Sequence, residues 1–141
     1  MLKKIPQNLS PDLVKVLMEM GHGDEIVIGD GNFPGASQAN HLVRCDGLKI
    51  PELLESILEL FTLDTYTEYP VSLMEVVKGD SYIPEIWDVY KRILKESGEK
   101  NTKIEYLDRF SFYEKSRQAY AIVTTSEKSL YANVILKKGV I

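Results

Sequence analysis

Residues 10–30 read SPDLVKVLMEMGHGDEIVIGD, and this stretch decides the fold class. Ser10 is a typical helix N-cap, and Pro11 is typical of the first helical position. Apolar residues then recur with the spacing of one helix face, at Leu13, Val16, Leu17 and Met20. A glycine follows, and residues 26–28 form the short apolar run of a buried strand. The stretch therefore predicts a helix, a turn that carries His22, and a strand that ends just before Asp30.

The rest of the chain continues this alternation of helices and strands. A glycine-rich loop is expected at 29–35. We expect further strands at 42–44, 71–77, 103–107, 120–125 and 131–136, and further helices at 51–61, 84–94 and 110–119. This pattern predicts one α/β domain over residues 1–141, with a mostly parallel central sheet covered by helices on both faces. Ligands of such sheets bind beyond the carboxyl ends of the strands, where Asp30 is expected to lie.

The bulk composition indicates an ordinary folded chain. Its 141 residues are the size of one domain, and 44% hydrophobic and 27% charged residues are close to globular averages. The formal net charge of −4 argues against binding to nucleic acid or to an anionic membrane surface. A small neutral ligand fits this charge better.

The single cysteine, Cys45, has no partner for an internal disulfide, so we expect a reducing compartment, the cytoplasm. We expect Cys45 to be an inert buried thiol, because no partner for nucleophilic catalysis accompanies it. No apolar run approaches the ~18 residues of a spanning helix, so neither secretion nor membrane insertion is expected.

His22, Asp24 and Asp30 are candidates for acid–base chemistry. An imidazole titrates near neutral pH, and a nearby carboxylate can orient it. The alternative is that His22 only hydrogen-bonds a carbonyl at a helix end, and the residues alone leave both interpretations open. A metal site made of His22, Asp24, Asp30 and His41 is conceivable, but no recognised ligand spacing is present. The glycines around Asp30 indicate a turn rather than a phosphate loop, since no Lys-Ser/Thr pair follows.

Two later segments carry residues suited to sugar hydroxyls. Arg109 precedes the aromatic run Phe110-Ser111-Phe112-Tyr113 and could bind hydroxyls, although a surface ion pair is the simpler interpretation. Tyr131-Ala132-Asn133 combines a ring that can stack on a sugar with an amide that can pair with adjacent hydroxyls. A tyrosine at the start of a strand is equally typical of ordinary packing.

Taken together, residues 17–30 (LMEMGHGDEIVIGD) and Asn32-Phe33-Pro34 resemble the opening of the ribose pyranase and fucose mutarotase family. The resemblance continues through 60–66 (LFTLDTY), 109–114 (RFSFYE) and 131–140 (YANVILKKGV), and so covers essentially the whole chain. The RFSFYE run resembles the fucose branch of the family. The ribose-type members resemble each other in carrying a histidine at the position of Arg109. Asn32 departs from the fucose-type members, which often carry histidine or another residue there.

The resemblance implies a cofactor-free isomerase that interconverts cyclic forms of a free monosaccharide. It also implies a ring-shaped homo-oligomer, typically a decamer, with sites near the subunit contacts. His22 matches the catalytic histidine of the family. The matching substrate-binding positions are Asp30, Arg109, Tyr131, Ala132 and Asn133, and further positions around the fucose pocket match Asp64, Met74 and Tyr113. No metal is implied.

The function predicted from this resemblance is an L-fucose mutarotase that opens and recloses the sugar ring by acid–base catalysis. His22 would exchange a proton with the sugar, and Asp30 would hold that proton or orient the substrate. Two alternatives stay open. One is a D-ribose pyranase, and the other is a sugar-binding or transport-accessory protein that catalyses no reaction.

Overall fold

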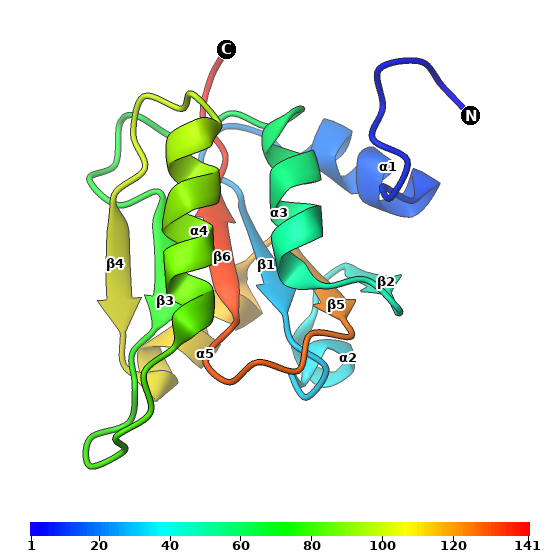
Figure 1. The fold of residues 1–141 in the computed structure, drawn as a ribbon. Coiled ribbons are helices and arrows are strands. Elements are labelled where there is room, and N and C mark those ends of the chain that lie inside the picture. The colour runs from blue at the N-terminus through cyan, green and yellow to red at the C-terminus, as the bar shows by residue number, and fades with distance from the viewer.

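A mixed sheet of six strands forms the centre of the computed structural model, which describes residues 1–141. The strands are β1 (Glu25–Gly29), β2 (Leu42–Cys45), β3 (Val71–Met74), β4 (Ile104–Leu107), β5 (Ala121–Thr125) and β6 (Val134–Lys137). Their order across the sheet is β2-β5-β1-β6-β3-β4. β5 pairs in parallel with β1 and β2, and β3 pairs in parallel with β4, whereas β6 is antiparallel to its neighbours β1 and β3. The predicted mostly parallel sheet is confirmed, with one reversed strand inside it (Figure 1).

The strand directions define two ends of the sheet. β1 to β5 all point the same way, downwards in Figure 1, and we call the end where they finish the carboxyl end. The opposite end is the amino end. Because β6 is reversed, it starts at the carboxyl end, and the residues just before it lie beside those that follow β1 and β3.

Helices cover both faces of the sheet, as predicted. On one face lie α1 (Pro11–Glu19), α3 (Ile50–Leu58) and α4 (Glu85–Glu96), and on the other lie α2 (Gly35–Gln38) and α5 (Arg109–Gln118) (Figure 1). β1 contributes to two apolar clusters, with Ile26 and Ile28 in the larger one and Val27 in the smaller one. This alternation follows from the two-residue period of a strand and fixes the strand between both layers.

The first helix forms as the sequence predicts. The Ser10 hydroxyl accepts a hydrogen bond from the Leu13 N–H at 3.2 Å, and Pro11 occupies the first helical position. The apolar face of the helix is buried, at Leu13, Val16 and Leu17. None of the helices combines the length and apolar character needed to cross a membrane.

Several predicted boundaries are wrong. Tyr131, Ala132 and Asn133 do not belong to the last strand, which begins at Val134, and Tyr131 has a left-handed backbone with φ of 57° that no strand accommodates. β3 ends at Met74, so residues 75–77 belong to the following loop. The helix predicted over 51–61 is α3, and it ends at Leu58 rather than at residue 61. Residues 35–38 form the short helix α2, which directly follows the loop expected at 29–35 and was not predicted.

Candidate functional site

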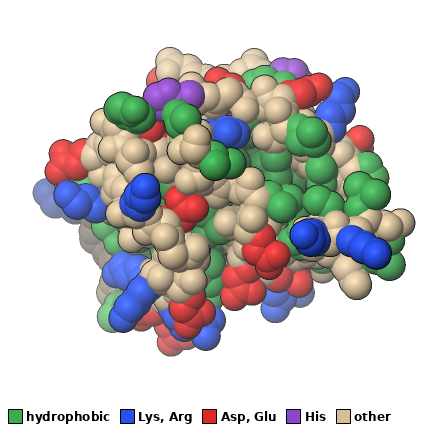
Figure 2. All heavy atoms as spheres, turned by 90° about the horizontal axis from the view of Figure 1, so that it is seen from above, with side chains coloured by type: hydrophobic (Ala, Val, Ile, Leu, Met, Phe, Trp, Pro, Cys, Tyr) green, Lys and Arg blue, Asp and Glu red, His purple; other side chains and the backbone are tan.

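His22 lies at the amino end of the sheet, on the turn between α1 and β1. Its Nε2 is 3.1 Å from Oδ1 of Asp64, a residue that is only 4% exposed. The same carboxylate oxygen accepts the backbone N–H of Tyr66, whose ring lies against the imidazole at 5.2 Å between centroids. The side chain of His22 itself is 47% exposed. Histidine side chains are visible on the surface of this end of the molecule in Figure 2.

The ionised carboxylate of Asp64 determines which ring nitrogen of His22 carries the proton. Burial alone would raise the pKa of Asp64, but hydrogen bonds from the Tyr66 N–H and from His22 hold that pKa below its ordinary value. An ionised carboxylate only accepts hydrogen bonds, so the Nε2 of His22 must be the donor. The Nδ1 of the neutral imidazole is then free to take up a proton, which is the arrangement of a general base.

Asp30 and Asn133 meet at the carboxyl end. The backbone N–H of Asp30 donates to Oδ1 of Asn133 at 2.7 Å, and Asn133 is only 7% exposed. One carboxylate oxygen of Asp30 accepts the N–H of Asn32 at 2.8 Å. Burial raises the pKa of Asp30 above its ordinary value, and hydrogen bonds to the carboxylate from the Asn32 and Phe33 N–H groups and the Asn133 side chain only partly oppose that effect. The result is a half-buried carboxylate that binds a proton more readily than an exposed aspartate does.

The segment 131–133 is held by helix α4. The Trp87 indole N–H donates to the Tyr131 carbonyl at 2.8 Å, and the Tyr90 hydroxyl donates to the Ala132 carbonyl at 2.6 Å. Ala132 is fully buried, and Tyr131 is half-buried. These two bonds stabilise the left-handed conformation of Tyr131, which would otherwise be disfavoured for a residue with a side chain.

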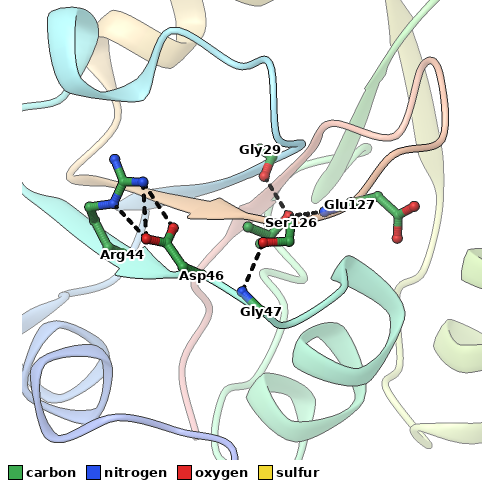
Figure 3. Close-up of polar contacts among 7 residues, drawn as sticks. Gly29, Arg44, Asp46, Gly47, Ser126 and Glu127 are labelled. Atoms are coloured by element: carbon green, nitrogen blue, oxygen red, sulfur yellow. Dashed lines mark hydrogen bonds and ion pairs between the residues drawn. The ribbon is translucent and has the colours of Figure 1, made fainter.

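The end of β5 and the turn that follows it also form hydrogen bonds with the backbone on either side of Asp30. The Thr125 hydroxyl donates to the Gly29 carbonyl at 2.9 Å and accepts the N–H of Glu127. Figure 3 shows Gly29 and Glu127 close to this turn. The Gly31 N–H donates to the Glu127 carbonyl at 2.9 Å. Burial would raise the pKa of Glu127, but the N–H groups of Ser129 and Lys128 hold that pKa below its ordinary value. Residues on both sides of Asp30 are therefore bonded to the β5–β6 connection.

Arg109, Met74 and Tyr113 lie at the same end of the sheet, towards the face that α5 covers. Arg109 is the exposed first residue of α5, and its guanidinium carbon is 5.6 Å from the centre of the Tyr113 ring. Tyr113 also packs against Phe33 at 5.8 Å, and Met74 is buried in the same apolar cluster. Arg109 and Tyr113 line an open groove of about 1030 Å³, which Asp30 and Asn133 do not line.

The structure thus places seven of the nine predicted site residues at the carboxyl end, and it places His22 and Asp64 elsewhere. The five-residue strand β1 separates His22 from Asp30, which corresponds to ~16 Å at about 3.3 Å per residue. The four side chains considered as a metal site do not gather, and no group of three or more His, Cys, Asp or Glu residues could hold a metal ion. One chain alone therefore does not bring the imidazole to Asp30.

Four residues of the carboxyl end went unrecognised in the sequence: Asp80, Trp87, Tyr90 and Glu127. Trp87 and Tyr90 show only the spacing of a helix core, and Glu127 stands in a polar stretch. Asp80 follows Gly79, whose φ of 92° marks a turn, and this glycine-aspartate pair is the one local signal that the sequence offers.

Polar side chains beyond the carboxyl ends of the strands of an α/β sheet are typical of proteins that bind small polar ligands there. The chain belongs to the RbsD / FucU transport protein family, whose model matches residues 3–141. The resemblance seen in the sequence is therefore confirmed.

Individual relatives match over the whole chain. The L-fucose mutarotase of Histophilus somni (strain 2336) is 47% identical over 140 residues, covering 99% of this chain and 97% of the relative. The crystal structure of the fucose mutarotase from Streptococcus pneumoniae, in complex with L-fucose, is 58% identical with a TM-score of 0.95, and the match covers 99% of each chain. The structure of Bacillus subtilis RbsD complexed with D-ribose is 25% identical with a TM-score of 0.71, covering 94% of this chain and 95% of that chain. The chain is thus more similar to the fucose protein than to the ribose protein.

Proposed function

We propose that the protein is an isomerase, an L-fucose mutarotase that interconverts the α and β anomers of the free sugar without a cofactor. The observation that carries this proposal is the full-length match to a fucose mutarotase structure that contains L-fucose, at 58% identity. The Arg-Phe-Ser-Phe-Tyr-Glu run from Arg109 supports the fucose branch, and the polar groups at the carboxyl end suit a neutral, hydroxyl-rich ligand.

The chemistry requires two proton transfers. The anomeric hydroxyl loses its proton while the ring oxygen gains one, so the bond between the anomeric carbon and the ring oxygen breaks and an open-chain aldehyde forms. Rotation about the next carbon–carbon bond exposes the other face of the aldehyde, and the reverse transfers close the ring. We assign the anomeric proton to Nδ1 of His22 and the proton at the ring oxygen to Asp30, with Arg109, Tyr131 and Asn133 binding hydroxyls.

The separation of His22 from Asp30 requires a second subunit in this mechanism. We propose that each site combines Asp30 of one subunit with His22 of a neighbouring subunit in a ring-shaped homo-oligomer, a decamer by the family resemblance. Large apolar side chains are exposed beyond the carboxyl end, at Phe110 (84%), Ile83 (80%) and Leu130 (55%). Contiguous exposed apolar patches mark surfaces that a partner covers, and these side chains would contribute to such a surface in the oligomer. Light scattering tests the assembly, and a monomer would overturn the shared site.

Exchange NMR on α- and β-L-fucose tests the reaction directly. The wild-type protein is expected to accelerate anomer exchange, and His22→Ala is expected to remove ~10²–10⁴-fold of that acceleration. His41→Ala is the matched control, since His41 is also exposed, its Nδ1 bonds the Tyr120 carbonyl, and it takes no part in the scheme. A pure wild-type protein without any acceleration would overturn the proposed function.

The same NMR series separates the alternatives. Faster pyranose–furanose exchange of D-ribose than anomer exchange of L-fucose would select a ribose pyranase. Binding of L-fucose without exchange would select a sugar-binding or transport-accessory role, in keeping with the transport label of the family.

We also place the protein in the cytoplasm, because its one thiol, Cys45, is buried and unpaired.

A further inference from the structure

The loop between β3 and α4 reaches beyond the carboxyl end of the sheet and bonds to the side chain of Tyr131 (Figure 1). The Tyr131 hydroxyl donates to Oδ2 of Asp80 at 2.7 Å and accepts the backbone N–H of Val77 at 3.3 Å. The other oxygen of Asp80 accepts the N–H of Tyr82 at 2.9 Å, and the rings of Tyr82 and Tyr131 stack at 5.9 Å. The loop therefore holds both the ring and the hydroxyl of Tyr131.

These contacts fix the direction of the Tyr131 hydroxyl. A phenol has one proton and two lone pairs, and here the proton points to Asp80 while one lone pair is used by Val77. The second lone pair is the one position left, and it can only accept a hydrogen bond. The hydrogen bond from Tyr131 also keeps the pKa of Asp80 below its ordinary value, so this carboxylate is ionised and the bond is charge-assisted.

The backbone of Tyr131 is fixed independently, from helix α4 rather than from the loop. The Trp87 indole bonds its carbonyl, and the left-handed φ of 57° sets the direction in which the side chain leaves the backbone. Asp80 is thus not needed to shape the 131–133 segment. It is itself exposed, and its side chain bonds only the loop and the Tyr131 hydroxyl.

We propose that Asp80 is a positioning residue that presents the Tyr131 hydroxyl to the sugar as an acceptor, so that Tyr131 selects a donating sugar hydroxyl. This inference rests on the proposed function, in which Tyr131 binds the substrate. It predicts that Asp80 affects substrate binding through the direction of one O–H bond, and not through folding.

Two substitutions of Asp80 distinguish an effect on the direction of the Tyr131 O–H bond from an effect on the anchoring of the loop. In Asp80→Asn the carboxamide oxygen still accepts the Tyr82 N–H, so the loop keeps this bond. The amide nitrogen that replaces Oδ2 donates to the Tyr131 hydroxyl. The hydroxyl therefore keeps its position, but its proton can no longer point to residue 80. Asp80→Ala removes both contacts. Both variants are expected to bind L-fucose about tenfold more weakly in isothermal titration calorimetry, with a matching rise in KM and little change in kcat. Asp88→Asn, an exposed aspartate of α4, is the control.

If Asp80→Asn binds as wild type while Asp80→Ala does not, Asp80 only anchors the loop and the proposal is overturned. A double-mutant cycle adds a second test: in a Tyr131→Phe background, Asp80→Asn is expected to cause no further loss of affinity. A further full tenfold loss in that background would also overturn the proposal. A wild-type protein that neither binds nor exchanges fucose would instead overturn the proposed function, which distinguishes the two failures.

Discussion

At the carboxyl end of the sheet, Asp30 is bonded from several segments, whereas at the amino end His22 has one side-chain bond, to Asp64. The Asp30 loop is tied to Asn133, to Glu127 and to Thr125 through its backbone. The imidazole of His22 is 47% exposed, hydrogen-bonds the Asp64 carboxylate and lies against the Tyr66 ring. One end is a set of polar groups held in place by several hydrogen bonds, and the other presents a single oriented side chain to its surroundings.

In the proposed mechanism this difference assigns substrate binding to one end of the sheet and proton exchange to the other. Groups that discriminate hydroxyls need to be held in place by a supporting network, and at the carboxyl end the buried Asn133 and the β5–β6 connection form such a network. A proton-exchanging group needs a defined tautomer and access to the sugar, which the buried Asp64 and the exposed ring of His22 supply. In the proposed mechanism each reaction needs both ends, so the proposal of a shared site makes the strongest prediction.

Mixing two inactive variants tests whether the ends come from different subunits. His22→Ala and Asp30→Ala chains are each expected to lose ~10²–10⁴-fold of the exchange activity. Random co-assembly of equal amounts is expected to restore about a quarter of the wild-type activity, because that fraction of shared sites receives both intact residues. Exchange NMR on co-purified, differently tagged chains measures the recovery. Co-assembly without recovery would mean that both residues serve the same subunit's site.

Asn133→Ala tests the network at the carboxyl end. The substitution leaves the Asp30 N–H without its acceptor in a buried setting, so the free energy of unfolding is expected to fall by about 1–3 kcal/mol. Urea unfolding at fixed protein concentration measures this change. Asn32→Ala is the matched control, since the Asn32 side chain is exposed and only its backbone N–H bonds Asp30, and it is expected to change stability by less than ~0.5 kcal/mol. Equal effects of the two variants would show that the pocket is not held by Asn133.

The two carboxylates are expected to affect stability in opposite directions with pH. The folded-state pKa of Asp64 lies below its unfolded value, so Asp64 stabilises the fold above the unfolded value, and this contribution is lost as the pH falls through the folded-state pKa. The folded-state pKa of Asp30 is raised, so its favourable contribution is present below the unfolded value and lost as the pH rises through the folded-state pKa.

Replacing each aspartate by asparagine measures its contribution to stability separately. Asp64→Asn is expected to lower the urea midpoint at pH 7, with a difference from wild type that shrinks as the solution becomes strongly acidic. Asp30→Asn is expected to leave the midpoint at pH 7 unchanged or higher, because it removes a charge that burial disfavours. A loss of stability at pH 7 in Asp30→Asn equal to that in Asp64→Asn would contradict the assigned directions.

Much of this architecture follows from local sequence patterns. Ser10, Pro11 and the spacing from Leu13 predict the first helix, and the apolar run before Asp30 places that residue at a strand end. The reversed strand β6 could not be predicted in the same way, because strand direction depends on pairing between distant segments. Its consequence is that 131–133 lie beside Asp30, which no local pattern indicates.

The candidate site is predictable only in part for the same reason. Asp30 and His22 stand out as polar residues at the two ends of one apolar run, and the family resemblance adds the others. The contacts that set their chemistry join residues far apart in the chain, such as His22 with Asp64 and Asp80 with Tyr131. The left-handed Tyr131 also went unrecognised, since tyrosine favours strands and tertiary contacts from α4 override that preference.

Tyr66→Ala is the finest test of the amino end, because it removes a contact of His22 without touching the Asp64 bond. The Tyr66 ring is 81% exposed, and only its backbone N–H bonds Asp64, so unfolding should change by less than ~0.5 kcal/mol. Exchange activity is expected to fall by ~2–5-fold, since the imidazole gains rotamer freedom that must be lost again in the reacting geometry. Tyr69→Ala, at another exposed tyrosine of the same connection, is the control. A loss as large as that of His22→Ala would mean that Tyr66 contacts the sugar itself, and the amino end would then be a binding surface and not only the support of a single base.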